Sequence, residues 1–124
     1  MKKLMVFLAV CLASSLVLAH AKSTYLSCPQ LDERASDLKV VLNQENGTAS
    51  LQTSSGGPGL NFTSPASFGP DVVQWRKDSH SLKQTYSVDR STLVLERKTL
   101  SGMTDKTYSE KSNCTVVSVS KRKF

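Results

Sequence analysis

Hydrophobic and polar residues alternate with a period of two along most of the chain after residue 70. Residues 72–76, 82–88, 92–96, 106–110 and 116–119 follow this pattern, with turn residues between them at a spacing of about ten residues. Successive side chains of a strand point to opposite faces, so the alternation is typical of strands with one buried face. The pattern predicts an antiparallel all-β domain whose last part is a meander.

An earlier pair of β-prone runs covers residues 38–42 and 48–52, on either side of Asn46 and Gly47. Asn-Gly between two such runs favours a tight type I′ turn, because both residues tolerate positive φ. The pattern therefore predicts a β-hairpin.

Only residues 31–38 have a helical composition. Leu31, Ala35 and Leu38 are spaced at i, i+4 and i+7, and Pro29 precedes them. The sequence as a whole predicts a single small antiparallel barrel or sandwich of about 7–8 strands, with room for one short N-terminal helical turn.

Residues 54–70, SSGGPGLNFTSPASFGP, interrupt the alternation. They contain three prolines, four glycines and no charged residue, together with Leu60, Phe62 and Phe68. We expect residues 60–63 to form a short edge strand whose Leu and Phe pack on the core. The alternative is a long loop that presents Leu60, Phe62 and Phe68 to a partner, since a connection of this length is often functional.

The N-terminus has the three parts of a secretory signal. Lys2 and Lys3 precede an apolar run at residues 4–18, and Ala19-His20-Ala21 is a small-x-small cleavage pattern. The run is shorter than the roughly 20 apolar residues that span a membrane. We predict a signal peptide at residues 1–21, a β-rich domain at residues 22–120 and a basic tail at residues 121–124. The expected location is secreted or periplasmic, with no transmembrane segment after cleavage.

Cleavage would remove Cys11 and leave Cys28 and Cys114. An exported pair of cysteines normally forms a disulfide, and two cysteines allow one intramolecular pairing. The sequence therefore predicts that Cys28 and Cys114 join the start of the domain to its end.

The predicted mature chain has 14 basic and 10 acidic residues, and three of the basic ones are Lys121, Arg122 and Lys123. The body of the domain is thus close to neutral, which disfavours a nucleic-acid binder because such proteins carry a basic face. The three tail residues are candidate contacts for an anionic surface; the alternative is a frayed, solubilising end.

Candidate chemistry is sparse. His80 is the only histidine after residue 21, and it follows Asp78 and Ser79 directly, although catalytic triads depend on spatial geometry and not on adjacency. The chain has no nucleophile elbow, phosphate loop or metal signature. We therefore expect no enzymatic activity, no cofactor and no metal.

Residues 25–28, Tyr-Leu-Ser-Cys, place one cysteine in an opening strand after a tyrosine, and the second cysteine, Cys114, lies near the C-terminus. In these features and in its expected architecture the chain is similar to small periplasmic β-barrel modules, among them the C-type lysozyme inhibitors. The chain departs from the Ser-Gly-x-x-Tyr loop of those inhibitors, because Ser101-Gly102 is followed by Met103-Thr104-Asp105. The resemblance implies a small barrel and does not assign an activity.

From these observations we predict a monomeric, exported, disulfide-linked β-domain that binds a macromolecule. The expected partner is another exported protein or a component of the cell envelope, as for an inhibitor or an envelope-associated module. The alternative is a lipocalin-like carrier of a small hydrophobic ligand, which requires an internal cavity.

Overall fold

The computed structural model describes residues 23–117, which lie within the predicted domain. These residues form an all-β fold, as predicted, with nine strands instead of seven or eight. The strands are β1 (Ser23–Ser27), β2 (Lys39–Asn43), β3 (Thr48–Gln52), β4 (Phe62–Phe68), β5 (Val72–Ser79), β6 (Leu82–Asp89), β7 (Val94–Ser101), β8 (Thr107–Asn113) and β9 (Thr115–Val116). The described residues contain no α-helix, only the single 3₁₀ turn η2 (Pro58–Leu60).

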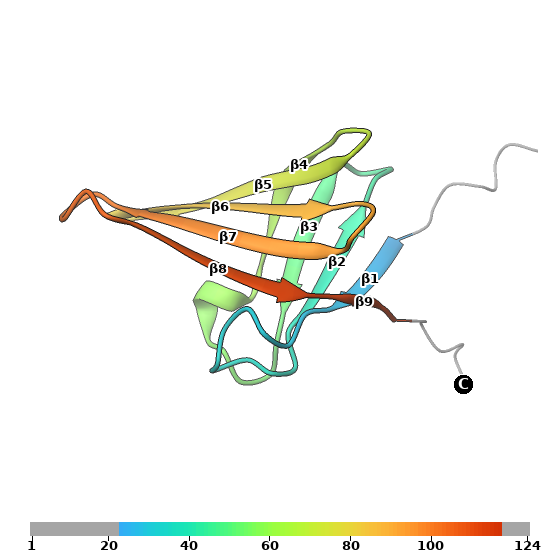
Figure 1. Ribbon diagram of the computed structural model, residues 1–124, viewed down its shortest axis with the longest axis horizontal. Coiled ribbons are helices and arrows are strands. Elements are labelled where there is room, and N and C mark those ends of the chain that lie inside the picture. Colours follow the sequence, from blue (N-terminus) through green and yellow to red (C-terminus); the bar gives the residue numbers. More distant parts are fainter. Residues whose placement is uncertain (1–22, 118–124) are drawn as a thin grey trace, which may run out of the picture.

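The nine strands form one antiparallel sheet in the order β8-β7-β6-β5-β4-β3-β2-β1-β9. Only Cys114 separates β8 from β9, so one continuous stretch of chain supplies both edges of the sheet. Its first part pairs with β7, and its last part pairs with β1 through Leu26 and Ser27. The sheet therefore curves round into a nearly closed barrel (Figure 1). This closure decides between the barrel and the sandwich left open by the sequence.

The predicted hairpin of β2 and β3 is confirmed, but its turn is not of type I′. Asn43 pairs with Thr48, which leaves a loop of four residues. Of Asn46 and Gly47, only Gly47 has a positive φ, at 68°. The Asn43 side chain accepts a hydrogen bond from the Asn46 N–H (2.9 Å) and stabilises this wider turn.

Residues 54–70 contain neither a long open loop nor a short edge strand. β4 is an interior strand of seven residues, and it pairs first with β3 and then with β5. Pro65, which has no N–H to donate, occupies the point where β4 changes partner, and the next residue, Ala66, donates to Gly47 O (2.8 Å). Pro65 thus marks a corner of the barrel.

Residues 31–38 form turns and not the expected helical turn. Ala35 N bonds to Asp32 O (2.9 Å) and Leu38 N bonds to Ala35 O (3.2 Å), which are contacts between residues three apart. The Asp32 carboxylate also accepts a hydrogen bond from Arg34 N (3.0 Å), a local contact that competes with helix formation. The apolar spacing still predicted burial correctly, since Leu31, Ala35 and Leu38 are at most 2% exposed.

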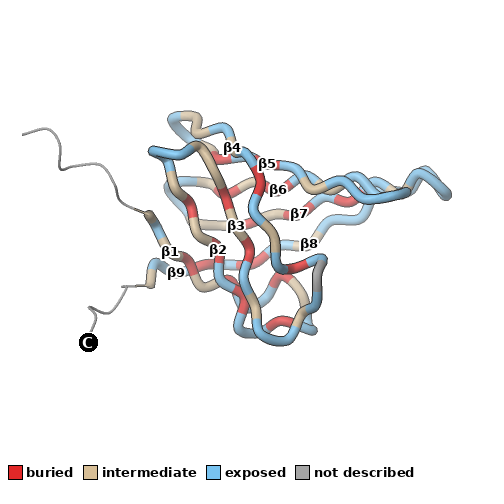
Figure 2. Tube along the Cα trace, turned by 180° about the vertical axis from the view of Figure 1, so that it is seen from behind, coloured by how far each residue is buried: buried red, intermediate tan, exposed pale blue. Residues whose placement is uncertain are grey.

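The core fills the barrel from the inward faces of the strands (Figure 2). Its centre is aromatic: the rings of Trp75 and Tyr86 stack at 5.5 Å, and Phe62 packs at 5.7 Å from Tyr86. β5 to β8 continue beyond this core as a long, twisted arm (Figure 1). The arm ends in the β5–β6 and β7–β8 turns, and it is exposed along most of its outer length (Figure 2).

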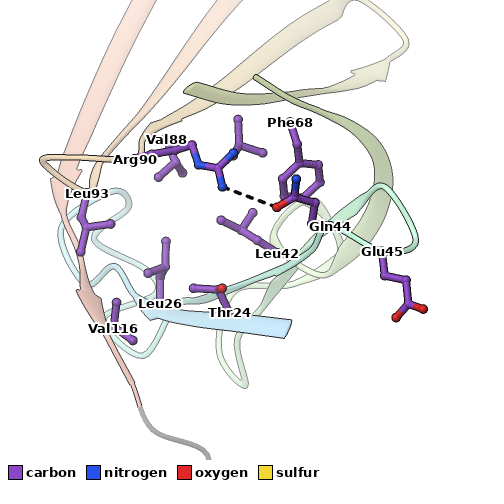
Figure 3. Close-up of a pocket in the computed structure, with 11 residues that line it drawn as sticks. Thr24, Leu26, Leu42, Gln44, Glu45, Phe68, Val88, Arg90, Leu93 and Val116 are labelled. Atoms are coloured by element: carbon purple, nitrogen blue, oxygen red, sulfur yellow. Dashed lines mark hydrogen bonds between the residues drawn. The ribbon is translucent and has the colours of Figure 1, made fainter. Parts of the chain in front are cut away.

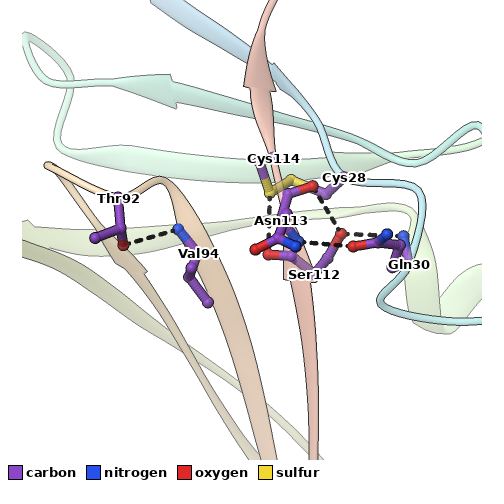
Figure 4. Close-up of a disulfide and its surroundings, with 7 residues drawn as sticks. All are labelled: Cys28, Gln30, Thr92, Val94, Ser112, Asn113 and Cys114. Carbon is purple, nitrogen blue, oxygen red and sulfur yellow. Dashed lines mark hydrogen bonds between the residues drawn. A yellow bond between two sulfur atoms is a disulfide. The ribbon is translucent and has the colours of Figure 1, made fainter.

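The predicted disulfide between Cys28 and Cys114 is confirmed (Figure 4). Both cysteines are buried, and Gln30 ties the same two segments together. Its N–H donates to Ser112 Oγ (3.0 Å), and its Oε1 accepts from Asn113 N (3.0 Å). A buried disulfide indicates an oxidising environment, extracellular or periplasmic. The predicted signal peptide and the tail residues Lys121, Arg122 and Lys123 lie outside the described residues.

Candidate ligand-binding site

A pocket of about 610 Å³ opens at the end of the barrel opposite to the tip of the arm (Figure 3). Its lining comes from strands and turns that are distant in sequence. The apolar members are Leu26, Leu42, Phe68, Val73, Val88, Leu93 and Val116. Thr24, Gln44, Glu45 and Arg90 complete the lining.

The strand alternation explains why the floor of this pocket is apolar. Leu26 on β1, Leu42 on β2, Val73 on β5 and Val88 on β6 all point inward and are at most 8% exposed. They belong to the core on one side and line the pocket on the other. The floor is therefore made of buried core residues that pack against other strands, as expected for a largely preformed pocket.

Polar groups gather at the mouth. Arg90 Nη1 donates to Gly69 O (2.7 Å), and its Nη2 lies 3.5 Å from Gln44 Oε1. Arg90 N also donates to Asp71 O (2.8 Å). The guanidinium thus links the β6–β7 turn with the β4–β5 and β2–β3 turns around the opening. A site of this kind can bind an apolar molecule and orient a polar group at its entrance.

The β6–β7 turn places Leu93 in the pocket wall. Asp89 Oδ1 accepts hydrogen bonds from Ser91 N (2.8 Å) and Thr92 N (2.9 Å), and these bonds lower the pKa of Asp89. Leu93 follows with a φ of 61°, in the left-handed region that non-glycine residues rarely adopt. Its carbonyl accepts from Cys114 N (3.0 Å), so the turn is anchored to the disulfide.

A second, more polar hollow of about 570 Å³ lies between residues 30–34 and strands β7 and β8. Arg97, which is 8% exposed, reaches Asp32 Oδ2 (3.3 Å) and Glu110 Oε1 (3.0 Å) from there. Arg34 also binds Asp32, and its side-chain hydrogen bonds are the main reason why the pKa of Asp32 lies well below its usual range. These contacts attach the turn segment to the barrel, which is a structural role.

The candidate partner-binding residues of the sequence prediction lie in three different environments. Leu60 is 1% exposed and belongs to the core. Phe62 is half-buried against Tyr86, with Lys77 Nζ 5.5 Å from its ring centroid. Phe68 lines the pocket. Their contact with a macromolecular partner stays a prediction, but the structure does not bring the three side chains together on one surface.

His80 is exposed in the β5–β6 turn, and the neighbouring Asp78 carboxylate pairs with Arg76 (3.2 Å). Within residues 23–117, no group of three or more His, Cys, Asp or Glu side chains is arranged to hold a metal ion. None of the helical structure described there is long and apolar enough to cross a membrane.

Sequence reasoning did not identify most of the pocket residues. Leu26, Leu42, Val73 and Val88 look like ordinary core positions, and only the closure of the barrel brings them to one end. The sequence did show two large apolar residues next to turn residues, Phe68 and Leu93. In the structure both are partly buried against the core.

Comparisons with known proteins give no relative for this fold and pocket: no family model, no curated protein and no solved structure matches the chain.

Proposed function

We propose that the protein binds a small, mainly apolar ligand in the pocket at the end of the barrel. The observation that supports this proposal is the lining: seven apolar side chains surround a volume of about 610 Å³, and the polar groups are confined to the mouth. Pockets for small ligands and cofactors typically have volumes of about 300–1,000 Å³ and mainly apolar walls with a few polar groups. The function is that of a carrier or sensor of such a ligand.

The mouth limits the class of ligand. Arg90 and Gln44 supply polar groups at the entrance, and Thr24 adds a hydroxyl at an exposed position of the wall, whereas the buried floor residues are apolar (Figure 3). A ligand with an apolar body and one polar end would leave that end at the mouth, since burying an unpaired polar group is costly. An amphiphile such as a fatty acid has this distribution.

The first test is native mass spectrometry of protein purified without denaturant. We expect a fraction with a mass above that of the bare chain, and extraction with organic solvent should release the bound molecule. The complementary test is titration of the delipidated protein with cis-parinaric acid, a fluorescent fatty acid. Only the bare mass, together with no saturable fluorescence change, would contradict the proposal.

A pair of matched variants connects the signal to the pocket. Thr24→Trp places a large side chain at an exposed position of the pocket wall (Figure 3) and should abolish saturable binding of the probe. Gln74→Trp introduces the same side chain at an exposed position of β5 outside the pocket lining and should leave binding unchanged. Equal binding by both variants would place the probe elsewhere.

A further inference from the structure

The exposed apolar residues of the molecule are concentrated at the end of the arm. Within residues 23–117 five large apolar side chains are exposed, and four of them belong to this end: Leu82 (36%), Leu100 (42%), Met103 (80%) and Tyr108 (49%). The fifth, Val116, lies at the rim of the ligand pocket. A cluster of this kind marks a contact surface, because isolated exposed apolar residues are common but clustered ones are not.

Backbone hydrogen bonds hold the end of the arm in one piece. Gly102 N donates to Ser81 O (2.7 Å), which joins the β7–β8 turn to the β5–β6 turn. Ser101 N donates to Lys106 O (3.0 Å) and Asp105 N donates to Ser101 O (2.9 Å), which close the outer turn. The strands therefore project the apolar side chains away from the core.

These side chains lie on both faces of the arm. Leu82 is an even number of residues from the buried Tyr86 on β6, so it continues the inward face of the barrel. Thr99 is on that face because it pairs with Gln84, and Tyr108 is on it because it pairs with Thr99. Leu100 has the opposite parity and lies on the outer face, beside Lys83. Met103 occupies the turn between them. A protein surface would cover one face of such a tip, whereas a lipid interface would surround it.

The net charge of the arm's end also favours a lipid interface over a protein surface. Residues 23–117 contain ten basic and ten acidic residues in total. The arm's end, residues 76–84 and 98–109, contains five basic and two acidic ones and carries a net charge of +3, so the remaining described residues carry −3. A basic, apolar tip attracts an anionic surface, and the net negative charge of the other described residues offers no such attraction.

We propose that the end of the arm inserts into the surface of a membrane that contains anionic phospholipid. Leu82, Leu100, Met103 and Tyr108 enter the boundary between headgroups and acyl chains, and Lys83, Lys98 and Lys106 meet the anionic headgroups. Apolar burial combined with electrostatic attraction is the general mechanism of such interfacial binding. The proposal goes beyond ligand binding and does not depend on it.

The test is sedimentation of the chain that begins at Lys22, with its disulfide formed, with lipid vesicles. We expect binding to phosphatidylcholine vesicles that contain phosphatidylglycerol, weaker binding at high salt, and little binding to phosphatidylcholine alone. The double variant Leu100→Ser/Met103→Ser should weaken binding by roughly tenfold or more. Val72→Ser removes a partly exposed apolar residue outside both the tip and the pocket and should have no effect.

Charge variants separate the tip from other basic residues. Lys83→Gln/Lys106→Gln should weaken binding and reduce its dependence on salt, whereas Lys39→Gln/Lys111→Gln, with the same change of charge on the body, should have little effect. The variant Lys121→Gln/Arg122→Gln/Lys123→Gln tests the tail. If the tail variant lost binding and the tip variants retained it, the tip would be excluded as the contact.

Tryptophan fluorescence at the tip gives a positive signal of insertion. It does not rely on a loss of binding, which misfolding of a variant could also cause. Trp75 is 2% exposed in the core, so its own emission should not change when vesicles are added, and any change in the emission of Met103→Trp reports on the tip. With anionic vesicles, its emission should shift to the blue and be quenched by brominated lipid, and Gln74→Trp should show neither change. No shift at residue 103, or no binding by the unaltered protein, would overturn the proposal and leave a protein contact as the use of this surface.

Discussion

Cys28 and Cys114 lie 86 residues apart in sequence, yet their Cα atoms are 4.4 Å apart across the seam where the sheet closes. Cys28 follows β1 directly, and Cys114 is the residue between β8 and β9. Within residues 23–117, two residue pairs join β1 to β9 at this seam, and Val117 N donates one further hydrogen bond to Tyr25 O (2.8 Å). The covalent bond therefore supplements the part of the barrel with the least backbone pairing.

Removal of this bond should destabilise the protein strongly. Closing a loop of 86 residues lowers the entropy of the unfolded chain by an amount equivalent to about 4.5 kcal/mol in the chain-entropy model. We expect Cys28→Ala/Cys114→Ala to lose about 3–5 kcal/mol of unfolding free energy in urea denaturation. The unaltered protein treated with reductant should show a similar loss, and a loss well below 1 kcal/mol in both would mean that β1 and β9 hold the seam without help.

Asp32 should make stability depend on pH. Hydrogen bonds from Arg34, together with the charges of Arg34 and Arg97, lower the pKa of Asp32 in the folded protein below its unfolded value near 3.9. A lowered folded pKa contributes stability that is complete above the unfolded pKa and is lost as the pH falls through the folded one. Asp37, whose carboxylate accepts hydrogen bonds from Ser54 and Thr53, also has a lowered pKa and adds to the effect in the same direction.

The variant Asp32→Asn isolates this contribution. At neutral pH it should unfold more easily by about 2–3 kcal/mol, because the largely buried Arg97 loses one of its two carboxylate partners and keeps only the more exposed Glu110. Below about pH 4 the difference from the unaltered protein should shrink, since the carboxylate is then increasingly protonated in the unfolded chain. A difference that stayed constant from pH 7 to pH 2 would show that its cause is packing and not charge.

At Leu93, substitution by glycine should give a more stable protein than substitution by alanine, which is the reverse of the usual order of stability. At its φ of 61° a side chain with a Cβ costs about 1–2 kcal/mol, which glycine avoids. Leu93→Gly should therefore be more stable than Leu93→Ala by about 1 kcal/mol. At Val94, which begins β7, thermal denaturation should give the ordinary order, with alanine the more stable.

Tyr86→Phe should cost little. Tyr86 is fully buried, and burial raises its pKa and keeps its hydroxyl neutral. The Arg97 guanidinium lies near this hydroxyl, but no hydrogen bond of normal geometry joins them in the part of the chain that the structure describes. Removing an unpaired buried hydroxyl while keeping the ring should change stability by less than about 1 kcal/mol, with either sign. Tyr86→Ala should lose about 3–5 kcal/mol, because the stack with Trp75 disappears. A large loss in Tyr86→Phe would reveal a bond from the hydroxyl.

The strand alternation predicted inward faces well but not the length of the barrel. The alternation puts Val73 and Trp75 on one face of β5 and Tyr86 and Val88 on one face of β6, and all four are at most 2% exposed. Leu82 has the same parity on β6 and is 36% exposed, because β6 there has left the barrel and belongs to the arm. Periodicity reports which face a side chain occupies, and only the packing of other strands decides whether anything covers that face.

The local sequence by itself determined the β class, the hairpin of β2 and β3 and the single pairing open to Cys28 and Cys114, because these depend on side-chain period, turn chemistry and the number of cysteines. Tertiary structure decided the rest. Pro65 became a corner and not a break because β4 exchanges one neighbour for another at that residue. The pocket formed because closure of the sheet brings Leu26 and Val88, distant in sequence, to one end of the barrel, and closure depends on contacts between residues that no local pattern connects.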